Sequence, residues 1–178
     1  MSRLFTQPVS EATGHAAQLF AAIKGAIGKV PNGYVTIGST SPVALEAALN
    51  LDGALRKGSL SAKEIEAVKL AVSQDADCGY CLAAHTLMGG QAGLSGDTML
   101  AVRHGKPSGD AKIDALAAFA HSVNGTSGGV ADAVLAAVKE AGYSDAQIVD
   151  TLLAIAAITF TNLLNRVNAT PLDFPPAP

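Results

Sequence analysis

The sequence has few cysteines, few aromatic residues and few charges. Its 178 residues include two cysteines and no tryptophan, with 4% aromatic and 49% hydrophobic residues. Few large rings and many small apolar residues favour closely packed helices over sheets. No stretch alternates apolar and polar residues for long enough to predict a β-strand. We therefore expect one all-α domain over residues 1–178, a length near the usual size of a single domain.

The charge content excludes two classes of partner. The formal net charge is −3 and charged residues make up 15% of the chain, so we expect no nucleic acid and no anionic membrane surface as partners. The most apolar segment, residues 151–164, is shorter than the ~20 residues that span a bilayer. Residues 1–17 lack a basic start followed by an apolar stretch, so we expect no signal peptide and a cytoplasmic protein.

Start and stop signals predict about seven to nine helices and no significant sheet. We expect the first helix over residues 10–27 and a loop over residues 28–33, where proline and glycine interrupt the pattern. Ser41-Pro42 starts the next helix, and Ser61 and Glu64 have the spacing of a capping box before a helix that ends near residue 74. Further helices are expected over residues 78–89, 96–103, 110–123, 130–141 and 144–167. The proline-rich tail, residues 171–178, should be extended.

The stretch DCGYCLAAH, residues 77–85, contains both cysteines and one histidine. We expect a helix to open at Cys78, capped by Asp77 or Asp75, and to stop at Gly89-Gly90. On this helix Cys78, Cys81 and His85 share one face, because they are three and four residues apart. The two sulfurs can therefore close a disulfide, and the free N–H groups and dipole at the helix start stabilise thiolates.

Assigning roles to these residues needs a further argument. Position at the first turn favours Cys78 as the attacking sulfur, whereas help from a base favours Cys81. Because His85 lies about 10 Å of helix rise from Cys78, we assign Cys81 as the nucleophile, Cys78 as the resolving thiol and His85 as the general base. The Glu64 side chain can bond to Ser61 in the capping box. Glu66 is therefore the candidate whose side chain faces inward and orients His85.

Other polar residues receive less specific interpretations. Tyr80 lies between the cysteines and either forms a hydrogen bond near the thiols or packs on the core, and core packing is the better interpretation. His15, His104 and His121 have no partner at motif spacing and are assigned to the surface or to packing. Three polar residues on the long apolar helix are structural candidates rather than site residues: Asn162, Asn165 and Arg166.

The pattern Glu66, eleven residues, Cys78-x-x-Cys81-x-x-x-His85 resembles the alkylhydroperoxidase D-like (AhpD-like) branch of the carboxymuconolactone decarboxylase family. Further similar stretches are GKVPNGY (28–34), SPVALEAAL (41–49), LSAKEIEAVKLAVS (60–73) and TNLLNRVNATPLDFP (161–175). The resemblance implies an AhpD-like helical bundle that assembles into trimers or hexamers. It also implies a disulfide-cycling site that reduces hydroperoxides or passes electrons to a peroxiredoxin.

In that family the second cysteine reacts with peroxide, the first resolves it, and a Glu–His pair relays protons. These roles correspond to Cys81, Cys78, Glu66 and His85. The best-studied branch has a second histidine directly before the second cysteine, where this sequence has Tyr80. Decarboxylases of the wider family do not need the cysteine pair, so decarboxylation is not the expected activity here.

The sequence thus predicts an antioxidant, peroxidase-type oxidoreductase, a thiol-dependent hydroperoxide reductase or disulfide oxidoreductase. Its redox group is the disulfide, with no cofactor or metal, and an external dithiol resets it, such as a lipoyl or thioredoxin-like protein or a peroxiredoxin. Three alternatives stay open. They are a redox adaptor or sensor with little peroxidase turnover, a carboxymuconolactone decarboxylase-like lyase, and a zinc-binding structural module with Glu66 as fourth ligand.

Overall fold

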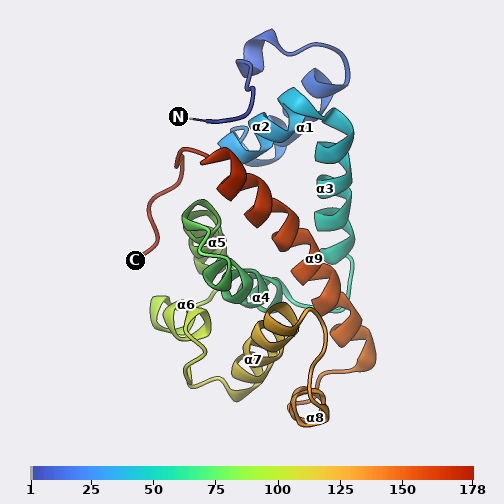
Figure 1. Cartoon of the computed structure of the whole chain (residues 1–178), viewed down its shortest axis with the longest axis vertical. Helices are drawn as coiled ribbons and strands as arrows, with labels where there is room; N and C mark the ends of the chain where they lie inside the picture. Colours follow the sequence, from blue (N-terminus) through green and yellow to red (C-terminus); the bar gives the residue numbers. More distant parts are fainter. Residues whose placement is uncertain (1) are drawn as a thin grey trace.

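The computed structural model describes residues 2–178, and within them the all-α prediction is confirmed (Figure 1). This part of the chain contains one short 3-10 helix, nine α-helices and no strand. In chain order they are η1 (Val9–Glu11), α1 (Gly14–Ile27), α2 (Asn32–Thr40), α3 (Pro42–Leu55), α4 (Ala62–Asp75), α5 (Gly79–Gln91), α6 (Gly96–Arg103), α7 (Ala111–Thr126), α8 (Asp132–Glu140) and α9 (Asp145–Asn168).

The centre of the molecule is α4, which packs against α5, α6, α7 and α9. Its start is fixed by the predicted capping box, because Ser61 Oγ accepts from the backbone N–H of Glu64 and the Glu64 carboxylate accepts from the N–H of Ser61. Every residue from Glu64 to Ser73 is buried. A helix that is covered on all sides places its polar side chains inside the protein, and each of these needs a partner there.

A second, smaller apolar cluster joins α1, α2 and α3. Phe20, Ile37 and Leu45 are its most covered side chains, and Leu164 of α9 packs against them. In Figure 1, α9 runs diagonally between this group of helices and the group around α4. The long last helix therefore connects the two clusters, and its inner face contributes to both.

The predicted loop over residues 28–33 is partly wrong, because α2 begins at Asn32. Pro31 is its cap residue and needs no N–H donor there, so proline starts this helix rather than preventing it. Gly33 lies inside α2 and is buried against Tyr80 and Asn165. The glycine therefore reflects close packing, not a turn, and sequence alone does not separate these two uses.

The predicted ends of two other helices also differ from the structure. The expected first helix is divided, since η1 is separate and α1 begins only at Gly14. The helix expected to stop at Gly89-Gly90 continues to Gln91. A Cβ on Gly89 would lie 2.8 Å from the sulfur of Met99, so this glycine allows α5 to approach α6, and the left-handed residue after the helix is Gly93, at φ 92°.

Within residues 2–178, α9 is long and apolar enough to cross a membrane by length and composition. One face of α9, including Ala154 and Ile158, is nevertheless buried in the core of this helical domain. The opposite face leaves large apolar side chains exposed in both halves of the helix. These are Val149, Leu152, Phe160, Leu163 and Val167.

The N-terminal segment and the start of the C-terminal tail both lie near the end of α9. The N-terminal segment is held by Asn168, whose Oδ1 accepts from the backbone N–H groups of Arg3 and Leu4 at 3.0 and 2.9 Å. After α9 the tail has no helix and runs back past α2 toward α5 (Figure 1). Asn32 Nδ2 donates to the carbonyl oxygen of Pro171 at 3.1 Å, which fixes the start of this path.

Candidate active site

The cysteine pair lies where α4 ends and α5 begins. Cys78 is itself the cap residue of α5, because its sulfur accepts a hydrogen bond from the backbone N–H of Cys81 at 3.3 Å. The N–H of Cys78 donates to the carbonyl oxygen of Ser73 at 3.0 Å. The short connection places Asp77 in the left-handed region, at φ 49°. The backbone around the pair is thus held by both helices.

The prediction that Asp77 or Asp75 caps α5 is wrong. Asp75 is the last residue of α4, and its carboxylate lies 2.8 Å from Nδ1 of His121 and accepts from Asn124 Nδ2 at 3.1 Å. Both partners belong to α7. Tertiary contacts with α7 therefore engage the Asp75 side chain, which the sequence spacing had suggested as a cap for α5. The cap position falls instead to Cys78, one residue after Asp77.

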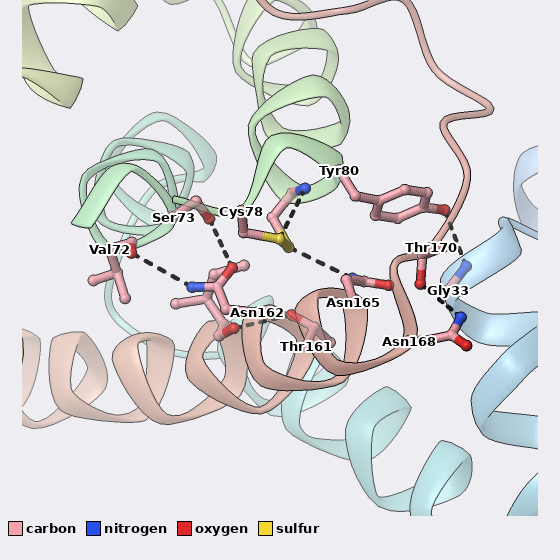
Figure 2. Close-up of a disulfide and its surroundings, with 12 residues drawn as sticks. Gly33, Val72, Ser73, Cys78, Tyr80, Thr161, Asn162, Asn165, Asn168 and Thr170 are labelled. Atoms are coloured by element: carbon pink, nitrogen blue, oxygen red, sulfur yellow. Dashed lines mark hydrogen bonds between the residues drawn. A yellow bond between two sulfur atoms is a disulfide. The ribbon is translucent and has the colours of Figure 1, made fainter. Parts of the chain in front are cut away.

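Cys78 and Cys81 form a disulfide, with their Cα atoms 5.3 Å apart (Figure 2). The expectation that the two sulfurs can bond across one turn is therefore confirmed. Both residues are almost fully buried, with exposed fractions of 1% and 3%. When the bond is reduced, the helix start offers N–H groups and a positive dipole end that favour thiolates. The environment of the pair can thus stabilise a thiolate after reduction, and it shields both sulfurs from solvent.

Glu66 and His85 meet as the sequence analysis expected. Nδ1 of His85 lies 2.7 Å from Oε2 of Glu66, and both side chains are about nine-tenths buried. A carboxylate accepts, so Nδ1 carries the proton in this hydrogen bond and leaves Nε2 as the nitrogen that can take one up. Glu64 is occupied in the capping box, which agrees with the reasoning that selected Glu66. His85 and Cys81 lie one turn apart on α5.

A second, partly buried ion pair lies next to this one, and no local sequence pattern predicted it. Lys69, one turn after Glu66 on α4, donates to Oδ1 of Asp52 at 2.7 Å, and the hydroxyl of Tyr34 donates to Oδ2 at 3.2 Å. Burial by itself would raise the pKa of Asp52, but the charge and hydrogen bond of Lys69, followed by the charge of His85, hold that pKa below its usual range. Burial, and then Asp52, raises the pKa of Tyr34.

Asn165 of α9 also reaches the pair, a position that its interpretation as a structural candidate did not predict. Its Nδ2 donates to the sulfur of Cys81 at 3.5 Å (Figure 2). Asn162, one turn earlier, accepts instead from Ser73 Oγ at 3.1 Å and donates to the carbonyl oxygen of Val72. The available sequence signal was the regular spacing of amides along an apolar helix, which predicts a shared face but not what that face contacts.

Tyr80 belongs to the buried core cluster, as the core-packing interpretation expected, and it also contacts the tail. Its ring meets that of Phe174 edge to face with centroids 5.6 Å apart, and its hydroxyl donates to Oδ1 of Asp173 at 2.7 Å. The same hydroxyl accepts from the backbone N–H of Gly33 at 3.1 Å. Burial is the main cause that raises the pKa of Tyr80, so the hydroxyl stays protonated. Lys29 adds an ion pair to Asp173, at 3.1 Å, which ties the tail beside the site.

The remaining candidates lie outside this group. His15 and His121 pair with carboxylates elsewhere, at 3.6 Å from Glu46 and 2.8 Å from Asp75. Among residues 2–178, no group of three or more His, Cys, Asp and Glu side chains is placed to hold a metal ion. A pocket of about 430 Å³ lies between α5 and the tail and contains none of the predicted site residues. It is lined by Ala83, Thr86, Leu87, Gly90, Gln91, Pro175 and Pro176.

The fold is shared with known structures. One is the crystal structure of an alkylhydroperoxidase AhpD core, an uncharacterized peroxidase-related protein from Ralstonia eutropha JMP134. It is 22% identical with a TM-score of 0.84, over 97% of this chain and 92% of that one. Another is the apo debrominase Bmp8, 17% identical with a TM-score of 0.78, over 97% and 93%. A cysteine-to-alanine variant of that debrominase in complex with 2,3,4-tribromopyrrole is 16% identical with a TM-score of 0.77, over 97% and 92%.

The chain is a helical bundle with a buried C-x-x-C disulfide at the start of α5. Residues 42–121, which include the whole of α3, α4 and α5, match the model of the Carboxymuconolactone decarboxylase family. No curated protein matches the chain. Residues 42–121 are thus similar to the carboxymuconolactone decarboxylase family, and the chain shares the fold of the AhpD core structure.

Proposed function

We propose that this protein is a thiol-dependent hydroperoxide reductase. The observation that carries the proposal is the buried Cys78–Cys81 disulfide on the same helix as a histidine that is oriented by a carboxylate. Reversible disulfide formation supplies two electrons, and the Glu66–His85 pair can move the protons that accompany them. The family match and the AhpD-like fold are consistent with redox chemistry.

The proposed cycle begins with the reduced pair. His85 takes the proton of Cys81 on Nε2, and the Cys81 thiolate attacks the terminal oxygen of a hydroperoxide, ROOH. The S–O bond forms as the O–O bond breaks, the sulfur is oxidised to a sulfenic acid, and the alkoxide takes the proton back from His85 to leave as an alcohol. Cys78 then attacks the sulfur of Cys81, so the S–S bond forms, the S–O bond breaks and water leaves.

The cycle closes when an external dithiol reduces the disulfide, and the redox centre needs no bound cofactor. We propose a lipoyl or thioredoxin-like protein as the reductant, or a peroxiredoxin as the redox partner, in a cytoplasmic setting that keeps thiols reduced. Because Cys78 and Cys81 are nearly inaccessible, part of the surrounding structure must move for a reductant to reach the pair. This requirement favours a small, extended thiol carrier over a bulky one.

The deciding experiment is mass spectrometry of alkylated protein before and after an organic hydroperoxide, with peroxide consumption measured in the presence of a dithiol. Loss of two alkylatable thiols with catalytic consumption, abolished in Cys81→Ser, would support the proposal. Fast disulfide exchange without consumption would favour the redox adaptor. One zinc per chain by elemental analysis would favour the structural module, and lactone decarboxylation that persists without both cysteines would favour the lyase.

A second candidate is reductive removal of bromine from a small aromatic ring. The observation that favours it is the likeness along 97% of this chain to a debrominase that was solved with 2,3,4-tribromopyrrole in a cysteine variant. The same dithiol would supply two electrons, replacing C–Br by C–H and releasing bromide as the disulfide forms. Bromide release from tribromopyrrole by the reduced protein, compared directly with hydroperoxide turnover, separates the two substrates.

We also propose that the protein forms a homo-oligomer, a trimer or hexamer, through the exposed face of α9. Phe160 and Leu163 are 37% and 62% exposed at the middle of this face, and Val149 and Val167 extend it to both ends of the helix. A contiguous apolar stripe of this length is typical of an interface. Light scattering after size exclusion should give a multiple of the 17.9 kDa chain, and Leu163→Glu should shift it to the monomer.

A further inference from the structure

The side-chain amide of Asn165 makes one hydrogen bond and leaves one atom unused. Its Nδ2 donates to the sulfur of Cys81 at 3.5 Å, and the residue is 7% exposed. Its Oδ1 is buried and has no hydrogen-bond partner among residues 2–178. A buried carbonyl-type oxygen without a donor is unfavourable, and native proteins rarely keep one without a function. This orphaned acceptor belongs to the side chain that touches the proposed nucleophile.

The other two buried asparagines of α9 show that this is not a general property of the helix. Oδ1 of Asn162 accepts from Ser73 Oγ at 3.1 Å. Oδ1 of Asn168 accepts from two backbone N–H groups, those of Arg3 and Leu4. Folding therefore satisfies the amide oxygen at both neighbouring positions and leaves it unpaired only in Asn165, whose amide nitrogen contacts the sulfur.

Next to this oxygen lies a glycine, and no larger residue fits there. A Cβ on Gly33 would lie 2.8 Å from Oδ1 of Asn165 and 3.3 Å from the ring of Tyr80, so any other residue would push against the amide. The backbone N–H of Gly33 is already used by the hydroxyl of Tyr80 and does not serve the amide. The three residues come from α2, α5 and α9, and in Figure 2 Asn165 lies between the disulfide and Gly33.

We propose that Asn165 is a catalytic residue of the hydroperoxide reaction, an inference that rests on the proposed function and deepens it. In the reduced protein Nδ2 donates to the Cys81 thiolate and lowers the pKa of that thiol. Oδ1 accepts a hydrogen bond from the terminal O–H of the hydroperoxide and holds the oxygen that the thiolate attacks. That oxygen and its proton stay on sulfur as the O–O bond breaks, so the same hydrogen bond then holds the sulfenic acid until Cys78 displaces water.

This assignment defines the substrate class. A hydroperoxide carries the O–H group that the orphaned oxygen needs, whether the rest of the molecule is a hydrogen atom or an alkyl chain. Sites that are built to bind a hydroxyl discriminate against molecules that lack one, because the buried acceptor is then left unpaired. The amide also explains how one residue can serve two successive states without moving, since neither contact is lost when the S–O bond forms.

The test uses the full chain with Cys78→Ser, which stops the reaction at the sulfenic acid and leaves Cys81 as the only thiol. Two variants are added to this background: Asn165→Leu, which removes both hydrogen bonds, and Asn165→Asp, which keeps the shape and an acceptor. Asn162→Ala is the matched control, because it deletes a buried amide of the same helix that contacts Ser73 rather than the sulfur. Circular dichroism establishes that each variant is folded.

Two readouts separate the two roles. The pH dependence of alkylation gives the thiol pKa, which should rise by about one unit in Asn165→Leu and further in Asn165→Asp, where a second negative charge faces the sulfur. Stopped-flow oxidation by cumene hydroperoxide, at a pH where the thiol is fully ionised, should slow by about 10- to 100-fold in Asn165→Leu and be partly retained in Asn165→Asp. The control should match the Cys78→Ser parent in both.

The outcomes distinguish this inference from the proposed function. A parent that reacts rapidly with hydroperoxide while Asn165→Leu keeps its thiol pKa and rate would overturn the role of Asn165 and leave the reductase standing. A parent that does not react with hydroperoxide would overturn the reductase and the O–H contact together, and the thiol pKa would still decide whether Nδ2 stabilises the thiolate. Equal losses in Asn165→Leu and Asn162→Ala would show a merely structural role.

Discussion

Nδ1 of His85 and Oε2 of Glu66 lie 2.7 Å apart, across the contact between α5 and α4. The two residues are 19 positions apart in sequence and both are buried. The carboxylate accepts a hydrogen bond from Nδ1 and leaves Nε2 as the free ring nitrogen. This arrangement supports the proposed role of His85 as a base, one turn from Cys81.

The two cysteines should give different defects when changed singly. Cys81→Ser should abolish hydroperoxide consumption, because a serine hydroxyl cannot reduce the O–O bond. Cys78→Ser should keep one rapid turnover per chain and then stop at the sulfenic acid. Stopped-flow kinetics with dimedone trapping and mass spectrometry measures both. A sulfenic acid found on Cys78 in a Cys81→Ser protein that still consumes peroxide would reverse the assignment of roles.

His85→Ala should slow oxidation of the reduced protein about 100-fold near neutral pH, in the range expected when a general base is removed. Glu66→Gln should slow it about tenfold, because an amide orients the ring without stabilising the imidazolium. Rates are measured by stopped flow from pH 5 to 9. The control is His121→Gln, which removes a histidine that is paired in the same way with Asp75, at 2.8 Å, outside the site. Equal losses in the control would argue against a special role for His85.

The Asp52–Lys69 pair should make part of the stability depend on pH. The folded pKa of Asp52 lies below its unfolded value of about 3.9, so its contribution is complete above about pH 5 and is lost as the pH falls through the folded pKa. Asp52→Asn leaves Lys69 buried without a charge partner and should cost about 2–3 kcal/mol at pH 7. Urea unfolding should show this difference shrinking by pH 3, whereas the exposed Glu140→Gln should show little difference at either pH. A difference that is independent of pH would contradict this account.

Removal of residues 171–178 should expose the cysteine pair more often. The truncation deletes the hydrogen bond from Tyr80 to Asp173 and the ring contact with Phe174, together worth about 1–2 kcal/mol. Alkylation of the reduced protein and reduction of the disulfide should therefore accelerate roughly tenfold. Deleting only Ala177 and Pro178 keeps both contacts and serves as the control. Unchanged rates in the longer truncation would show that access does not depend on the tail.

Much of the fold was accessible from the sequence because helix signals are local. The capping box at Ser61 forms as its spacing predicted, and Ser144 starts α9 with a box of the same kind, since each involves residues only three positions apart. α2 was missed because Pro31 and Gly33 read as breakers, whereas proline is allowed at a helix start and Gly33 is set by packing against Asn165. Glycine and proline have both local and tertiary uses, and sequence shows only the first.

For the candidate site, the residue spacing alone determined that Cys78 and Cys81 can bond and that His85 follows one turn later, because a helix brings residues three and four apart onto one face. Tertiary structure decided the rest. It gave Asp75 to α7, turned Asn165 of α9 toward the sulfur of Cys81, and placed Lys69 beside Asp52. The physical reason is that buried polar groups pair with whatever the packing of distant helices brings within reach, and no local pattern encodes that choice.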